Sequence, residues 1–254
     1  MNKVLIAAPI GDGKEYSINE WFDWIVNNDF DNIEVAFCVN GMSQESIENK
    51  LKLLKTVELV HKSGKKIPFH LLKINYRESY SLFERVGYSR EELRLFSIEN
   101  GFSHLFFLDT DTIPSDSKSL NRLLARNQDF VTGVYFYKGS KQPVLIDEVL
   151  RTNVTLEKLE EHFIHGSLFR IWGCGYGCLL MSRKLLECCV FDWDIHKDNW
   201  GEDFAHCEMV EKEGFKKFCD ARVVCRHYRK KDFTQEIKKS VLVDGIGNEK
   251  TNKD

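Results

Sequence analysis

The feature that most constrains this chain is an apolar run that ends abruptly at two aspartates. Residues 103–108, Ser-His-Leu-Phe-Phe-Leu, precede Asp109, Thr110 and Asp111, and Pro114 closes the segment. An aromatic-rich run of this kind is typical of a strand buried on both faces, and Pro114 prevents an ordinary central strand from continuing. Paired acids at the C-terminal end of a buried strand are typical of an α/β active site and can bind a divalent cation. The alternative is a strand-to-turn junction whose carboxylates accept hydrogen bonds from the turn backbone.

Segments with strand and helix periodicity alternate on both sides of this run. Strands are predicted over 3–9, 33–39, 67–74, 129–136 and 217–228, and helices over 17–27, 43–63, 90–100, 115–127, 182–189 and 199–213. This alternation predicts an α/β fold with a mostly parallel central sheet and helices on both faces. Pro68 suggests that the strand over 67–74 lies at an edge of the sheet.

Composition excludes several classes of protein. The 254 residues carry a net charge of −3, so no general affinity for nucleic acid is expected. No apolar run approaches the ~20 residues that span a bilayer, although a peripheral membrane contact needs no such run. The eight cysteines form no convincing zinc-ligand set, and the N-terminal apolar segment is too short for a signal peptide. We therefore expect reduced, mostly buried thiols and a cytoplasmic protein that could also touch a membrane surface.

Candidate ligand-binding residues follow the predicted strands. The loop after the first strand is expected to touch a ligand, as such loops commonly do in α/β sheets. Asn40, with Gly41, either forms a turn or faces a bound base or ribose. Arg77, Arg85 and Arg90 could each meet a phosphate, although an exposed arginine is the default interpretation.

The second half of the chain adds further candidates. Three glycines within residues 173–177 either begin a twisted strand or let the backbone approach a ligand closely. Glu202 and Asp203 begin a predicted helix, where the helix dipole favours acids whether or not they have a function. His227 ends the last apolar stretch, and a lone histidine is more often a structural residue than a ligand. Residues 230–254 predict a polar tail that is partly disordered or packs over the site.

Taken in chain order, these segments resemble the GT-A glycosyltransferases, which move a sugar from a nucleotide donor. The resemblance depends on Asp109-Thr110-Asp111, on the glycines within 173–177, on Gly201-Glu202-Asp203 and on His227, and it spans roughly residues 3–228. It implies a GT-A fold with a Rossmann-like nucleotide-binding half over about 1–115. The acceptor and catalytic half would cover about 116–230, and the tail 231–254.

The resemblance also implies roles for single residues. Asp203 would be the general base of an inverting enzyme, and Glu202 would bind the acceptor or the donor sugar. Asp111 and His227, with Asp109 directly or through water, would bind the Mn2+ or Mg2+ that bridges the donor diphosphate. The implied donor-binding residues are Ala8, Pro9, Ile10, Asn40, Arg94, Asp109, Thr110, Gly173 and Gly175. Many members have an acid where this chain has Asn40, which leaves recognition of the base open.

The implied reaction is transfer of a hexose from a UDP- or GDP-sugar to the hydroxyl of a glycan, lipid-linked or protein acceptor. Breaking the anomeric bond expels a nucleoside diphosphate, whose charge a carboxylate-bound cation can stabilise, and the acceptor hydroxyl needs a base. The position of Asp203 at a helix N-terminus predicts a lowered pKa for this carboxyl group. If the reaction retains configuration, Asp203 would instead orient the substrate.

Two other functions remain open at this point. The segment around Asp109 also resembles the opening motif of haloacid-dehalogenase-type phosphatases, in which Asp109 would be a phosphorylated nucleophile and Asp111 a general acid. That motif normally lies on the first strand, whereas three predicted strands precede it here. The other alternative is a nucleotide-sugar-binding module that has lost turnover, against which the intact set of acids and His227 argues.

Overall fold

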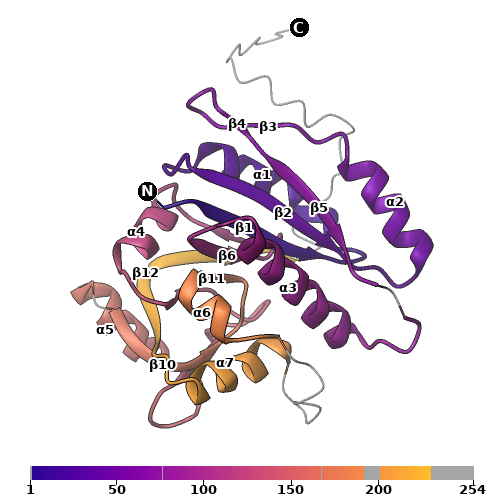
Figure 1. Ribbon diagram of the computed structural model, residues 1–254. Helices are drawn as coiled ribbons and strands as arrows, with labels where there is room; N and C mark the ends of the chain where they lie inside the picture. Colours follow the sequence, from indigo (N-terminus) through magenta and orange to yellow (C-terminus); the bar gives the residue numbers. More distant parts are fainter. Residues whose placement is uncertain (1, 76, 167, 192–200, 230–254) are drawn as a thin grey trace, which may run out of the picture.

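The computed structural model describes residues 2–75, 77–166, 168–191 and 201–229. Within these residues the strands of one large sheet are β1 (Val4–Ile10), β2 (Ile33–Val39), β5 (Phe69–Lys73), β6 (His104–Leu108), β7 (Thr112–Pro114), β8 (Phe130–Val134), β9 (Leu145–Asp147), β10 (Leu168–Cys174), β11 (Cys178–Ser182) and β12 (Lys217–His227). The helical elements are η1 (Glu15–Ser17), α1 (Ile18–Asn27), α2 (Gln44–Leu54), α3 (Leu82–Glu99), α4 (Ser119–Ala125), α5 (Leu156–His165), α6 (Arg183–Cys188) and α7 (Glu202–Lys212). The predicted α/β class is confirmed, because helices cover a central sheet (Figure 1).

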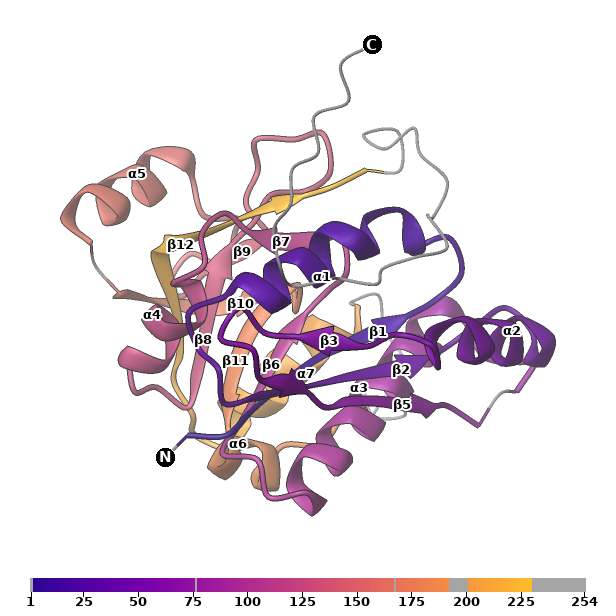
Figure 2. The same cartoon turned by 90° about the horizontal axis from the view of Figure 1, so that it is seen from above.

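The first half of the sheet is parallel. Its strands lie in the order β5-β2-β1-β6, and each neighbouring pair is parallel. β1, β2 and β6 are almost entirely buried, as expected for strands that helices cover on both faces. α1 and α3 lie on opposite faces of these strands (Figure 2). β5 forms the edge, as Pro68 suggested.

The second half of the sheet is mixed. From β6 the order continues β11-β8-β12-β10-β9, in which only β8 and β12 pair in parallel. One sheet therefore runs through both of the predicted halves. β12 also pairs antiparallel with the short β7, with His227 opposite Thr112. This pairing returns the end of the last strand to the segment that directly follows the two aspartates.

Two predicted helices have different bounds in the structure. The helix predicted over 43–63 ends at Leu54, because residues 59–67 form a hairpin of β3 (Leu59–Val60) and β4 (Lys66–Ile67) with Gly64 at a φ of +82° in its turn. The helix predicted over 90–100 instead begins at Leu82, where Ser81 and Glu84 form a capping box. The predicted tail over 230–254 lies outside the described residues.

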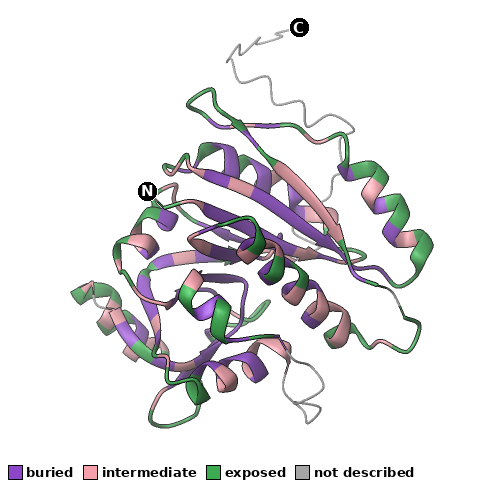
Figure 3. Cartoon of the chain, viewed as in Figure 1, coloured by how far each residue is buried: buried purple, intermediate pink, exposed green. Residues whose placement is uncertain are grey.

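The hydrophobic core consists mainly of the apolar segments that the sequence assigned to strands and helices. Figure 3 shows the sheet strands largely buried and the outer faces of the helices exposed. Trp21 and Phe22 of α1 pack against Phe37 of β2, with ring centroids 5.0 and 5.9 Å apart. All eight cysteines are free, and of these only Cys188 is exposed. No helix in the described residues has the length and apolarity needed to cross a membrane.

Candidate active site

A cleft lies where the C-terminal ends of β1, β2 and β6 meet. It has a volume of about 520 Å³, and its lining residues are Pro9, Gly11, Asp12, Lys14, Asn40, Gly41, Met42, Leu82, Phe83, Arg85, Val86, Arg90, Asp109, Thr110, Asp111 and Glu202. Ligands of open α/β sheets bind at this edge. The cleft thus joins the loop after the first strand, the turn at Asn40 and the paired aspartates, and their contact with a ligand stays a prediction.

The two aspartates have different surroundings. They lie in the tight connection between β6 and β7, in which the Thr112 N–H donates to the Asp109 carbonyl at 2.8 Å. The Asp109 side chain is 32% exposed and that of Asp111 is 1% exposed. Asp109 therefore faces the cleft, whereas Asp111 needs polar partners within the protein.

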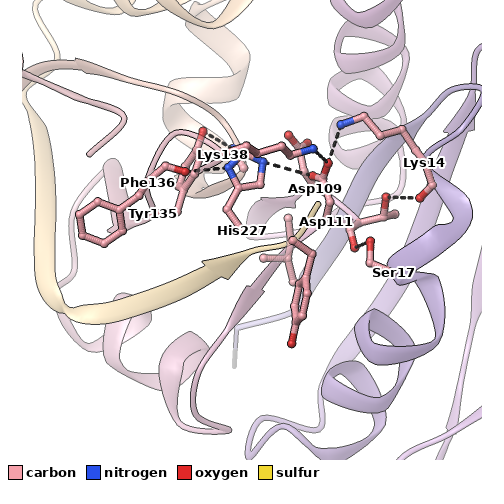
Figure 4. Close-up of polar contacts among 12 residues, drawn as sticks. Lys14, Ser17, Asp109, Asp111, Tyr135, Phe136, Lys138 and His227 are labelled. Atoms are coloured by element: carbon pink, nitrogen blue, oxygen red, sulfur yellow. Dashed lines mark hydrogen bonds and ion pairs between the residues drawn. The ribbon is translucent and has the colours of Figure 1, made fainter. Parts of the chain in front are cut away.

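Lysines from both halves of the sheet hold the buried Asp111. Lys14 and Lys138 each place Nζ 2.6 Å from Asp111 Oδ2, and the Tyr16 hydroxyl donates to the same oxygen at 2.9 Å. Figure 4 shows the two lysines reaching Asp111 from opposite sides. Burial would raise the pKa of Asp111, but the two ammonium groups outweigh it and hold this pKa well below its usual range. Asp111 is therefore ionised at neutral pH.

His227 lies beside the other oxygen of Asp111. Its Nε2 is 3.8 Å from Asp111 Oδ1, and its Nδ1 is 2.8 Å from the Phe136 carbonyl oxygen. The carbonyl accepts the Nδ1 hydrogen, which leaves the Nε2 lone pair directed toward Asp111 (Figure 4). Burial lowers the pKa of His227, so the imidazole is neutral near pH 7. The Nδ1–H to carbonyl contact is typical of histidines that bind metals.

The two side chains fit a divalent cation that takes its other ligands from elsewhere. Atoms that bind one cation at about 2.1 Å can be no more than about 4.2 Å apart, and Asp111 Oδ1 and His227 Nε2 satisfy this limit. Within the described residues, no three acidic, histidine or cysteine side chains gather closely enough to bind a metal alone. A cation here would complete its shell with phosphate oxygens and water, as Mg2+ commonly does. Direct ligation by Asp109 stays a prediction.

Arg90 was one of three arginines that the sequence offered as possible phosphate contacts, with nothing to single it out. It is 3% exposed, and its guanidinium bridges Asp109 Oδ1 and Glu202 Oε1, each at 3.3 Å. The rings of Phe107 and Tyr176 lie 5.0 and 5.5 Å from the guanidinium carbon. Arg90 thereby connects the acid after β6 to the acid that begins α7.

Arg94, the arginine predicted to bind the donor, lies one turn further along α3. It pairs with Glu91 and donates to the Leu186 carbonyl, and it does not line the cleft. Helical spacing indicates which residues share a face of α3, but only the position of α7 determines which turn faces Glu202.

Glu202 and Asp203 begin α7, which has Gly201 at its N-cap. Glu202 lines the cleft. Asp203 is half-buried and is not among the residues that line the cleft, and its Oδ1 accepts a hydrogen bond from the Phe204 N–H at 2.8 Å. Burial, with the adjacent charge of Glu202, raises the pKa of Asp203 well above its usual range, although Arg90 opposes this. The predicted lowering of this pKa was wrong, because desolvation and the neighbouring acid outweigh the helix terminus.

The other predicted donor residues divide into those that reach the cleft and those that do not. Pro9, Asn40 and Thr110 line the cleft, whereas Ala8 and Ile10 are fully buried and are not among its lining residues. The Asn40 amide donates to the Ser89 hydroxyl at 2.8 Å. Ser17 is the N-cap residue of α1, and its hydroxyl donates to the Thr110 carbonyl at 2.8 Å while making no capping hydrogen bond to the helix.

The glycines of residues 173–177 pack closely against other parts of the protein. A Cβ on Gly175 would lie 2.0 Å from the Tyr135 hydroxyl, and one on Gly173 would lie 3.2 Å from the Phe204 ring. The Tyr135 hydroxyl in turn accepts the Gly177 N–H at 3.1 Å. Close packing therefore accounts for glycine at both positions, and their predicted contact with the donor stays a prediction.

Comparison with known proteins identifies the fold. No protein-family model and no curated protein matches the sequence. Matching solved structures include A197 from STIV (TM-score 0.50, 16% identity, 89% of this chain and 86% of that chain). Another is the mannosyltransferase PcManGT from Pyrobaculum calidifontis in complex with GDP-Man and Mn2+ (TM-score 0.55, 12% identity, 91% and 58%). GalNAc-T7 with UDP, GalNAc and Mn2+ also matches (TM-score 0.54, 12% identity, 90% and 44%).

The fold is that of the GT-A glycosyltransferases. This chain spans 58% of the mannosyltransferase and 44% of GalNAc-T7. At these identities the likeness establishes the shared fold, and the activity has to be argued from the cleft.

Proposed function

We propose that this chain is a glycosyltransferase that moves a hexose from a UDP- or GDP-sugar to an acceptor hydroxyl, with Mn2+ or Mg2+ bound beside Asp111. The observation that carries the proposal is the meeting of Asp111 Oδ1 and His227 Nε2 at 3.8 Å beside the cleft. The mannosyltransferase and GalNAc-T7, which share the fold, were solved with nucleotides and Mn2+. In this proposal, residues of about 1–115 bind the nucleotide and residues of about 116–230 bind the acceptor.

The roles of the residues follow from their surroundings. Asp111 and His227 hold the cation, which when bound neutralises charge on the departing diphosphate. Asp109 faces the donor sugar or ribose, and Arg90 fixes Asp109 and Glu202 relative to each other. Asp203 takes the proton of the acceptor hydroxyl if the enzyme inverts configuration. A carboxylate with a raised pKa is a stronger base than an exposed aspartate, which suits this step.

Turnover of a panel of substrates tests the proposal. We expect the chain with Mn2+ to release nucleoside diphosphate from at least one UDP- or GDP-sugar, and an acceptor screen should then capture the sugar. Release of phosphate from a phosphomonoester, without release of nucleoside diphosphate, would support the phosphatase alternative and contradict the proposal. Metal-dependent binding of a nucleotide sugar without either product would support the binding module.

The raised pKa of Asp203 predicts how the rate depends on pH. A base acts only when it is deprotonated, so kcat should fall as the pH drops through the pKa of the Asp203–Glu202 pair. Because burial raises the pKa of both carboxyls, this fall should have its midpoint above 3.8, the ordinary value for aspartate. The measurement is kcat at saturating donor and Mn2+ over a pH series.

Binding of nucleoside diphosphate and Mn2+ over the same pH series is the control, because protonation of His227 would weaken binding. A fall in kcat that follows the loss of binding at every pH would contradict the assignment to Asp203. A fall that occurs while binding is still complete would support it.

A further inference from the structure

Two lysines share one carboxylate oxygen in the cleft, and the fold alone does not require both. Lys14 Nζ and Lys138 Nζ are both 2.6 Å from Asp111 Oδ2. One ammonium group is enough to neutralise one buried carboxylate. Within the described residues neither lysine pairs with another acidic side chain. Counted over these three side chains, the pair leaves one positive charge in excess at Asp111. Elsewhere in the cleft, Arg90 with Asp109 and Glu202 leaves one negative charge in excess.

The positions of the lysines make this excess charge available to a ligand. The Lys14 side chain is 45% exposed and that of Lys138 is 34% exposed, whereas Asp111 is 1% exposed. Lys14 lies in the loop after β1 and lines the cleft. Lys138 follows β8 and approaches Asp111 from the other side, as Figure 4 shows. Both side chains are partly exposed while their ammonium groups contact the aspartate, so they can turn toward an anion by changing rotamer, without unfolding either loop.

The excess charge also affects a divalent cation. A cation between Asp111 Oδ1 and His227 Nε2 would lie close to two ammonium groups that contact the other oxygen of the same carboxylate. The repulsion would be strong in a partly buried site, where water screens charges less than in bulk solution. The diphosphate of a nucleotide sugar carries two negative charges, which together with Asp111 offset most of the charge of the cation and the two lysines.

From this arrangement we propose that Lys14 and Lys138 form a protein-supplied cationic site for the diphosphate of the donor. In the protein without ligand, the two lysines hold Asp111. When the donor binds, they contact its diphosphate and release Asp111 for the cation, so the cation binds with the diphosphate and only weakly before it. The identity of the diphosphate as that of a nucleotide sugar rests on the proposed function, whereas the recognition of a diphosphate depends on the lysines alone.

The test compares binding in variants that lose the same number of positive charges. The variants are Lys14→Met, Lys138→Met and their combination, and the control is Lys141→Met combined with Lys184→Met. Lys141 and Lys184 are exposed, and Lys141 lies three residues after Lys138. Calorimetry in EDTA measures the binding of inorganic pyrophosphate, UDP and GDP. Electron paramagnetic resonance measures Mn2+ binding with and without pyrophosphate.

We expect the parent and the control to bind a diphosphate in EDTA. Each single variant should lose affinity by ~10-fold and the double variant by ~100-fold, because hydrogen bonds from charged donors contribute about this factor each. Mn2+ alone should bind the double variant at least ~10-fold more tightly than it binds the parent, because two repelling charges are gone. The single variants keep one lysine on Asp111, so they remain informative if the double variant does not fold.

Unchanged diphosphate affinity in EDTA for the folded variants would overturn the proposal, as would Mn2+ binding that is equally tight in the parent and the double variant. The proposed function can fail separately. Lysine-dependent binding of pyrophosphate without any turnover of a nucleotide sugar would support the cationic site and contradict the proposed transferase activity. Turnover of a nucleotide sugar by the parent, with no effect of the lysine variants on diphosphate binding, would support the transferase activity and contradict the cationic site.

Discussion

Replacing Asp203 with Asn should lower turnover by ~10²-fold to 10⁴-fold, the usual contribution of a general base, and should leave nucleoside-diphosphate affinity close to that of the parent. Asp203 is half-buried and its pKa is raised, so its carboxylate can accept a proton more readily than that of an exposed aspartate. Asn has nearly the same shape but cannot take the proton. Rapid-quench measurement of a single turnover, with saturating donor and Mn2+, isolates the chemical step.

Glu202→Gln is the matched control for this variant. Glu202 lines the cleft and pairs with Arg90, so its loss should mainly weaken the binding of a substrate and raise KM. If Glu202→Gln lowers the single-turnover rate as much as Asp203→Asn does while KM stays constant, the roles of the two acids are exchanged. Equal transfer rates in Asp203→Asn and the parent would remove Asp203 from the mechanism.

Replacing Arg90 with Leu should lower the free energy of unfolding by about 3 kcal/mol and reduce Tm by roughly 6–12 °C. Arg90 is 3% exposed and pairs with Asp109 and Glu202. Its removal leaves two negative groups without their cation in a partly buried site. The expected loss lies at the lower end of the range for broken buried pairs, because Asp109 is 32% exposed and retains contact with water. Thermal unfolding followed by circular dichroism measures it.

Two further variants make the Arg90 prediction specific. Arg90→Leu combined with Glu202→Gln should recover part of the lost stability, because the second change removes one of the unpaired charges. Arg170→Leu, which removes an arginine with a 49% exposed side chain from a surface pair with Glu148, should change Tm little. A Tm for Arg90→Leu within about 2 °C of the parent would show that the bridge between Asp109 and Glu202 contributes little.

The sequence predicted best those strands of the central sheet that are buried on both faces, because such strands must be made almost entirely of apolar residues. β1, β2 and β6 are apolar apart from Glu34 and His104, and they were predicted within about one residue of their observed ends. The helix over 43–63 was predicted too long, because charged residues continue past Leu54 with no apolar face to indicate the end. Only the pairing of Leu59 with Ile67 in a hairpin determines where the chain turns.

Sequence reasoning identified those residues of the candidate site whose type and position along the chain are chemically distinctive. Asp109 and Asp111 follow a buried strand, and the Glu202–Asp203 pair begins a helix. Lys14 and Lys138 have no such signal, since a lysine in a loop is usually a solvent-exposed residue, and only the meeting of their loops at Asp111 distinguishes them. Local sequence also could not show that Arg90, and not Arg94, faces the cleft. The direction of the Asp203 pKa shift was predicted wrongly because it depends on burial, which no local sequence pattern shows.

The most direct test of this account is pulsed electron paramagnetic resonance on Mn2+ bound to the protein together with UDP or GDP. We predict phosphorus coupling from the diphosphate and nitrogen coupling from one histidine in the same Mn2+ signal, and loss of the nitrogen coupling in His227→Gln. Phosphorus coupling without any histidine nitrogen, or a nitrogen coupling that persists in His227→Gln, would contradict a cation held between Asp111 and His227.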